Sequence, residues 1–170
     1  MNTLLIGNII ALLASTLMII ASYLKNKRNI LLVQTGQMIL FVLCNIVLGG
    51  ITGIVINTAS VIRNFLVLNN KLTKTSILII SIIMTILCLI YNNLGLVGLL
   101  PLLATLIYTI FINTKSTIKL KSLILITLIC WGIYDFTIKS YISVIFNMTG
   151  VVASIVSIYQ LLRNNKEYKF

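Results

Sequence analysis

The feature that most constrains the fold is a succession of seven apolar runs, each close to the length of a membrane-spanning helix. The runs cover residues 3–24, 30–48, 51–68, 75–91, 94–113, 122–138 and 141–162. A helix rises about 1.5 Å per residue, so roughly 20 residues cross the ~30 Å hydrocarbon core of a bilayer. Membrane β-strands instead alternate polar and apolar residues, and these runs do not. The sequence therefore predicts an all-α integral membrane protein with seven transmembrane helices.

The composition agrees with lipid as the surrounding medium. Charged residues make up 9% of the chain and hydrophobic residues 59%, whereas a soluble domain carries about 25% charged residues. The formal net charge of +11 would suggest nucleic acid as the partner of a soluble protein. Here the basic residues stand in short connections between apolar runs, so the lipid bilayer is the expected partner and nucleic acid is not.

The positions of the basic residues predict the orientation of the chain. Eleven of the 13 follow the first, third, fifth or seventh run: Lys25, Lys27, Arg28, Lys71, Lys74, Lys115, Lys119, Lys121, Arg163, Lys166 and Lys169. Lys139 alone lies on the other side, and Arg63 lies inside the third run, where we expect it to reach the cytoplasmic headgroups. Because basic loops stay in the cytoplasm, we expect the N-terminus outside and the C-terminus in the cytoplasm.

The chain contains a weak internal repeat. A shift of 90 residues superimposes the first three runs on the last three, and rare residue types coincide: Phe41 with Trp131, Asn45 with Asp135, and Asn57 with Asn147. The fourth run restores the direction of the chain, so both halves cross the membrane in parallel. We therefore expect a three-helix repeat in residues 1–69, a linker helix in 70–93, and a second three-helix repeat in 94–170 with a short basic tail (3+1+3).

Polar and aromatic residues form stripes in both halves. Gln37, Phe41 and Asn45 stand four residues apart, as do Thr127, Trp131 and Asp135, and this spacing places each set on one helix face. A polar side chain in lipid needs a partner or a wet cavity. We expect a central cavity in which Phe41, Asn57, Trp131 and Asn147 bind substrate, with Gln37, Asn45, Thr127 and Asp135 as further polar lining.

Other interpretations of these residues stay open. Asn57 and Asn147 would also serve as hydrogen-bonding contacts between helices, and tryptophan is favoured at the membrane interface. Asp135 stands four residues before Lys139, a spacing that favours a simple ion pair.

Catalytic and metal chemistry have little to build on. The chain has no histidine, and its three cysteines, Cys44, Cys88 and Cys130, all lie within apolar runs. Free cysteines in such places behave as small hydrophobic residues. No metal, no cofactor and no enzymatic activity are expected.

Two resemblances add to these expectations. The stretch Cys130-Trp131-Gly132-Ile133-Tyr134-Asp135-Phe136, followed by Asn147 and Leu161-Leu162-Arg163, resembles the closing segment of the bacterial inner-membrane YgjV-like family. The stretch from Leu43 to Leu66, with Gly49, Asn57 and Arg63, is similar to that family's third-helix region. The resemblance implies a location in the bacterial inner membrane and implies no particular activity.

More remotely, the 3+1+3 plan resembles the SWEET/MtN3 and PQ-loop superfamily of small-solute facilitators. That resemblance implies a tryptophan and an asparagine in the substrate pocket, and Trp131 and Asn147 stand 16 residues apart, as Phe41 and Asn57 do. The chain departs from the pattern in having a single proline, Pro101, and no Pro-Gln pair.

The expected function is facilitated passage of a small uncharged polar solute, such as a sugar, by alternating access. The alternative is a membrane scaffold or partner subunit that transports nothing. A homo-oligomer is compatible with either.

Overall fold

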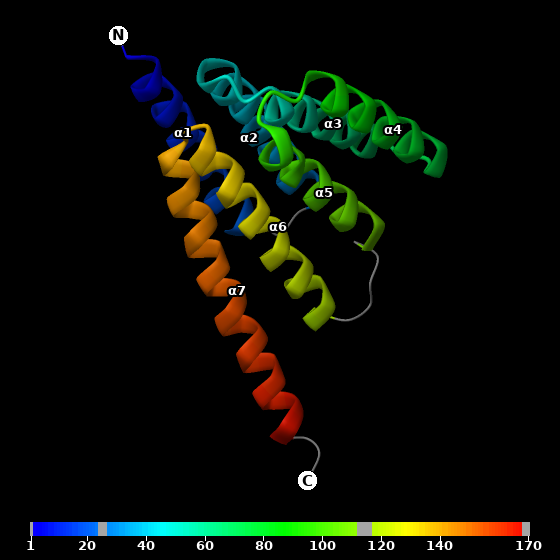
Figure 1. Cartoon of the computed structure of the whole chain (residues 1–170). Coiled ribbons are helices and arrows are strands. Elements are labelled where there is room, and N and C mark those ends of the chain that lie inside the picture. The colour runs from blue at the N-terminus through cyan, green and yellow to red at the C-terminus, as the bar shows by residue number, and fades with distance from the viewer. Residues whose placement is uncertain (1, 24–26, 112–116, 168–170) are drawn as a thin grey trace.

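The computed structural model describes residues 2–23, 27–111 and 117–167, which leaves the predicted basic residues Lys25, Lys115 and Lys169 outside the described chain. All regular structure in these ranges is helical (Figure 1). The helices are α1 (Thr3–Tyr23), α2 (Lys27–Leu48), α3 (Ile51–Leu68), α4 (Lys74–Tyr91), α5 (Gly95–Phe111), α6 (Thr117–Thr137) and α7 (Tyr141–Glu167). The predicted all-helical fold is confirmed.

The helices follow the apolar runs closely and extend past some of them. α2 begins at Lys27, α6 begins at Thr117, and α7 continues to Glu167, so each includes basic residues that the hydropathy pattern assigned to connections. Lysine and arginine are good helix formers, and a helix that has already formed gains one hydrogen bond for each residue added. Helices therefore continue beyond the stretch that lipid requires.

Within the residues that the structure describes, five of the helices are long and apolar enough to cross a membrane: Thr3–Ala21, Leu31–Leu48, Ile51–Leu68, Lys74–Tyr91 and Tyr141–Gln160. The apolar parts of α5 and α6 are shorter, at Gly95–Tyr108 and Ser122–Thr137. Seven apolar helices were predicted, and five of them have the length and composition of a full span.

Neighbouring helices along the chain pack together, and two further contacts close the bundle. α1 packs on α2 and α7, α3 packs on α2, α4 and α5, and α6 packs between α5 and α7. In Figure 1 the chain starts at one end of the bundle and α7 finishes at the opposite end.

Three connections and the start of α1 meet at one end of the bundle. The Asn93 side chain donates to the backbone oxygen of Gly49 (3.3 Å), which joins the α4–α5 connection to the α2–α3 turn. The Asn8 side chain donates to the backbone oxygen of Lys139 (3.0 Å) and accepts from the backbone N–H of Ile142 (3.0 Å). Asn8 thus satisfies one of the free N–H groups in the first turn of α7, and it fixes that turn against α1.

The distribution of side chains suits a protein surrounded by hydrocarbon. Large aliphatic residues cover the outside, as on α4, where Leu89 and Ile90 are 62% and 66% exposed. The interior instead holds many small or polar residues, among them Ala11, Ala14, Ser15 and Thr52. Small residues let membrane helices approach closely, and buried polar groups find partners between them.

Three helices approach closely at the start of α3. The Tyr134 hydroxyl accepts from the backbone N–H of Gly53 (2.8 Å) and donates to Asn45 Oδ1 (3.1 Å). A Cβ atom on Gly53 would overlap the Asn45 amide and lie 2.8 Å from that hydroxyl. Gly53 therefore lets α2, α3 and α6 meet, and the fully buried Tyr134 satisfies one of the free donors of α3.

Candidate functional site

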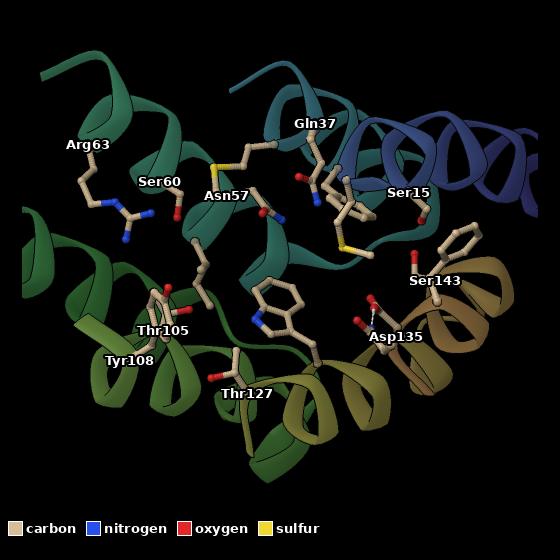
Figure 2. Close-up of a pocket in the computed structure, with 17 residues that line it drawn as sticks. Ser15, Gln37, Asn57, Ser60, Arg63, Thr105, Tyr108, Thr127, Asp135 and Ser143 are labelled. Carbon is tan, nitrogen blue, oxygen red and sulfur yellow. Dashed lines mark hydrogen bonds between the residues drawn. The ribbon is translucent and has the colours of Figure 1, made fainter. Parts of the chain in front are cut away.

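A cavity of about 220 Å³ lies at the centre of the bundle (Figure 2). Its lining comes from α1, α2, α3, α5, α6 and α7. The fourth helix contributes none of the described lining residues, and it packs on the outside of α3 and α5. The cavity is thus lined by the six helices that were predicted to form the two repeats.

The structure brings most of the predicted site residues together around this cavity. Phe41, Asn57, Trp131 and Asn147, predicted to bind substrate, all line it, and so do Gln37, Thr127 and Asp135 from the predicted polar lining. Their role in binding a solute stays a prediction.

Asn45 is the exception. It is 2% exposed, donates to the backbone oxygen of Phe41 (2.7 Å) and accepts from Tyr134. These bonds hold Asn45 in the junction of α2, α3 and α6, outside the cavity lining. Asp135, which the predicted repeat pairs with Asn45, does line the cavity.

Asp135 has a partner inside the cavity. The Asn147 side chain donates to Asp135 Oδ2 (2.8 Å), and Figure 2 shows this bond as a dashed line. The spacing of Asp135 and Lys139 had favoured an ion pair, but α6 ends at Thr137 and Lys139 adopts a positive φ of 63° with its side chain exposed. Because the helix stops before Lys139, helical spacing no longer relates the two side chains.

The turn that follows Asp135 is fixed by a chain of small polar groups. The backbone N–H of Ser140 donates to the Asp135 backbone oxygen (2.8 Å), and the Ser140 and Ser143 hydroxyls share a hydrogen bond (2.7 Å). Cys44 Sγ lies 3.7 Å from the Ser140 hydroxyl and donates to the Gly7 backbone oxygen (3.3 Å). These contacts hold the start of α7, and with it Asn147, against α1 and α2.

Asn57 lines the cavity from the opposite half of the bundle. It is 7% exposed, and its Nδ2 donates to the backbone oxygen of Gly53 (2.9 Å) one turn earlier. An asparagine side chain has two N–H donors and a carbonyl acceptor. Asn57 and Asn147 therefore each donate one hydrogen bond within the protein, and each retains a second N–H donor and a carbonyl acceptor.

Trp131 belongs to the interior of the bundle. It packs against the apolar cluster of Ile56, Met84, Cys88 and Leu102, and its ring meets the Tyr134 ring edge-on, with centroids 5.8 Å apart. Its position in the cavity lining differs from that of an interfacial tryptophan.

Arg63 also lines the cavity, and the sequence analysis missed it. Its place near the basic end of the third apolar run had suggested contact with lipid headgroups. Figure 2 shows the guanidinium at the end of the cavity that Ser60, Thr105 and Tyr108 also occupy, away from Asp135. The three-residue spacing of Asn57, Ser60 and Arg63 was the available signal, since residues three apart share a helix face.

The cavity thus combines aromatic faces, amides and hydroxyls with one cation and one carboxyl group. Among the residues that the structure describes, no three His, Cys, Asp or Glu side chains gather in a group that could hold a metal ion. What the lining offers is hydrogen bonding and apolar contact, which is what a site needs to orient a small polar molecule.

Comparison with known proteins gives one match. The model of a protein family described as bacterial inner membrane protein matches residues 5–165, which is nearly the whole chain. No curated protein and no solved structure matches the chain significantly.

Proposed function

The chain belongs to the Imp-YgjV family of bacterial inner membrane proteins, and we propose that it is a facilitator that carries a small polar solute across that membrane. The observation that carries the proposal is the central cavity, in which Phe41, Asn57, Trp131 and Asn147 share one lining. A packed bundle that served only as a scaffold would have no need of a hollow of about 220 Å³ with polar groups in its largely apolar lining.

The proposed architecture is the 3+1+3 plan, with α1–α3 and α5–α7 as parallel repeats and α4 as the linker. The pattern of helix contacts supports it. If α1 corresponds to α5 and α3 to α7, a contact between α1 and α7 should have an equivalent contact between α5 and α3. Both contacts are present, and α4 packs on the outside. Parallel repeats around a shared site suit alternating access, in which one bundle rocks against the other.

The depth of the site supports the same mechanism. Asn57 and Asn147 each follow the first residue of their helix by six positions, which corresponds to about 9 Å along the axis at 1.5 Å per residue. If both helices begin at the membrane boundary, both residues lie at matching depths inside the ~30 Å hydrocarbon core, as a shared carrier site within the membrane requires. We further propose the orientation that the basic residues favour, with the N-terminus outside and the C-terminus in the cytoplasm.

The aromatic and amide lining supports a solute with a sugar-like body. A ring packs its C–H face against Phe41 and Trp131, while the amides of Asn57 and Asn147 bind hydroxyl groups. This function needs no cofactor and no catalytic group.

The alternative, a scaffold or partner subunit that transports nothing, draws support from the Asn147–Asp135 hydrogen bond. In that case the polar groups of the cavity would serve packing between α6 and α7. Asn147→Leu would then lower stability or change assembly without any effect on the passage of solutes.

Uptake by proteoliposomes tests the proposal. Purified protein is reconstituted and assayed with a panel of radiolabelled small polar solutes, comparing wild type with Asn147→Ala and Trp131→Ala. The matched control is Ile145→Ala, which changes a 60% exposed residue on the outer face of the same helix. The proposal expects uptake that both cavity variants reduce and the control leaves intact. Uptake that neither cavity substitution changes would refute the assignment of Trp131 and Asn147 to the binding site. The absence of uptake for the whole panel would favour the scaffold.

A further inference from the structure

The charge of Arg63 has no counterpart within the described protein. Its guanidinium makes no hydrogen bond or ion pair with the side chains that the structure describes within residues 2–23, 27–111 and 117–167. The guanidinium carries five N–H donors and stays protonated in proteins. A charged group in a membrane interior without a partner is strongly unfavourable, unless it faces water or a ligand.

The sequence leaves few candidates for that partner. The chain has two acidic residues, Asp135 and Glu167. Asp135 accepts from Asn147 (2.8 Å), and Figure 2 places it at the end of the cavity away from Arg63. The side chain of Glu167 lies outside the part of the chain that the structure describes. Among the side chains that the structure describes, none therefore brings a negative charge to Arg63.

The surroundings of Arg63 suit an anion. Ser60 and Tyr108 line the same end of the cavity, and a hydroxyl group can donate a hydrogen bond to an oxyanion. The planar guanidinium fork matches the two oxygens of a carboxylate or phosphate. Asp135 is the single acidic residue in the described lining, so the Arg63 end offers positive charge and neutral donors.

We propose that Arg63 binds an oxyanion group of the solute, a carboxylate or a phosphate, while the polar body of the solute extends toward Trp131 and Asn147. The inference rests on the proposed function in one respect, that the cavity holds a solute. It revises the expectation of an uncharged sugar-like molecule to a small polyhydroxylated acid or a phosphate ester. The same chemistry is available from the headgroup of an anionic lipid, so the experiment separates the two sources.

Trp131 provides the readout, because it is the only tryptophan in the chain and lines the same cavity. Full-length protein in nanodiscs of phosphatidylcholine is titrated with sodium gluconate and with inorganic phosphate while tryptophan emission is followed. Sorbitol is the uncharged match of gluconate, and sodium chloride at equal ionic strength controls for screening. The proposal expects a saturable response to gluconate or phosphate and a much weaker one to sorbitol and chloride.

Variants connect the response to Arg63. Arg63→Gln should weaken binding of the oxyanion by about tenfold or more, since a charge-assisted pair is lost, and Arg63→Lys should fall between that variant and wild type. Lys71→Gln, which removes an exposed charge between α3 and α4, should bind as wild type does. Melting temperatures of the purified variants identify a folding defect, and Arg63→Lys keeps the test informative because it preserves the charge.

A second set of nanodiscs contains phosphatidylglycerol. If a lipid headgroup occupies the site, this lipid alone changes the emission of wild type but not of Arg63→Gln, and it suppresses the response to gluconate. That result would support the oxyanion site and identify a lipid headgroup as its ligand. The proposal is overturned if gluconate, phosphate and phosphatidylglycerol all fail to produce a response that depends on Arg63.

The outcomes also separate this inference from the proposed function. Binding that depends on Arg63 without uptake in proteoliposomes would refute the facilitator and keep the oxyanion site. Equal uptake of gluconate by wild type and Arg63→Gln would keep the facilitator and refute the oxyanion site.

Discussion

Replacement of Tyr134 by phenylalanine removes one oxygen atom from the junction of three helices. That hydroxyl accepts from the Gly53 backbone N–H (2.8 Å) and donates to Asn45 Oδ1 (3.1 Å), at a side chain that is 0% exposed. The phenyl ring keeps the edge-on contact with Trp131. The substitution therefore isolates the two hydrogen bonds and leaves the packing in place.

The expected loss follows from the contacts. Hydrogen bonds between membrane helices average about 0.6 kcal/mol and reach about 1.7 kcal/mol, so two bonds contribute about 1–3 kcal/mol. The upper part of this range applies here, because the variant leaves a donor on Gly53 and an acceptor on Asn45 stranded away from water. We expect Tyr134→Phe to lower the free energy of unfolding by about 2 kcal/mol.

The assay is equilibrium unfolding of the purified protein in mixed micelles, followed by far-ultraviolet circular dichroism as the fraction of denaturing detergent rises. Tyr91→Phe is the control, since Tyr91 is 57% exposed at the end of α4 and should change stability by less than about 0.5 kcal/mol. A loss for Tyr134→Phe no larger than that of the control would refute the hydrogen-bonded junction.

Three further predictions concern packing, the α6–α7 turn and the orientation of the chain. Gly53→Ala should lower the free energy of unfolding by about 1–3 kcal/mol in the same assay, because the new Cβ overlaps Asn45. The control Gly36→Ala, whose Cβ would meet Leu17 at an ordinary 3.5 Å, should be neutral or stabilising. Equal effects of the two substitutions would contradict the close approach at Gly53. Lys139→Gly should stabilise the protein by about 1 kcal/mol, because Lys139 holds a φ of 63° that glycine adopts without strain, and a destabilised variant would speak against this turn. Reporter fusions at the two ends should report opposite compartments, with the N-terminus outside, and a shared compartment would eliminate an odd number of spans.

Much of the fold could be predicted from the sequence because lipid imposes simple rules on it. A long apolar run can satisfy its backbone groups in hydrocarbon only as a helix or in a closed barrel, so the extents of α3, from Ile51 to Leu68, and of α4 follow almost directly from hydropathy. The ends of α6 and α7 could not be predicted in this way, because basic residues outside the hydrocarbon continue a helix as readily as they end it.

The candidate site was only partly predictable, and Asn45 and Arg63 show why. Four-residue spacing put Asn45 on the same face as Phe41. The Tyr134 hydroxyl, 89 positions away in the sequence, instead holds the Asn45 side chain in the helix junction by a hydrogen bond. Arg63 had the spacing of the cavity face, yet its closeness to the basic end of α3 favoured the headgroups. The packing of α5 against α3 decides that it lines the cavity, and hydropathy carries no information on which helices pack together.

The central claim is that the cavity between the helices holds water and admits a solute, and thiol labelling tests it most directly. Cys44, Cys88 and Cys130 are first replaced, and a single cysteine is then placed at position 147 in the cavity or at position 145 on the outer face of α7. A small polar methanethiosulfonate reagent reacts with the thiolate, which needs water.

The account predicts that the cysteine at position 147 reacts about tenfold faster than the one at position 145, because a thiol surrounded by lipid stays protonated. Addition of the solute that the protein carries should slow the reaction at position 147 alone. Equal protection of the two positions would contradict the account, since it would mean that the space around Asn147 and Trp131 is closed to water.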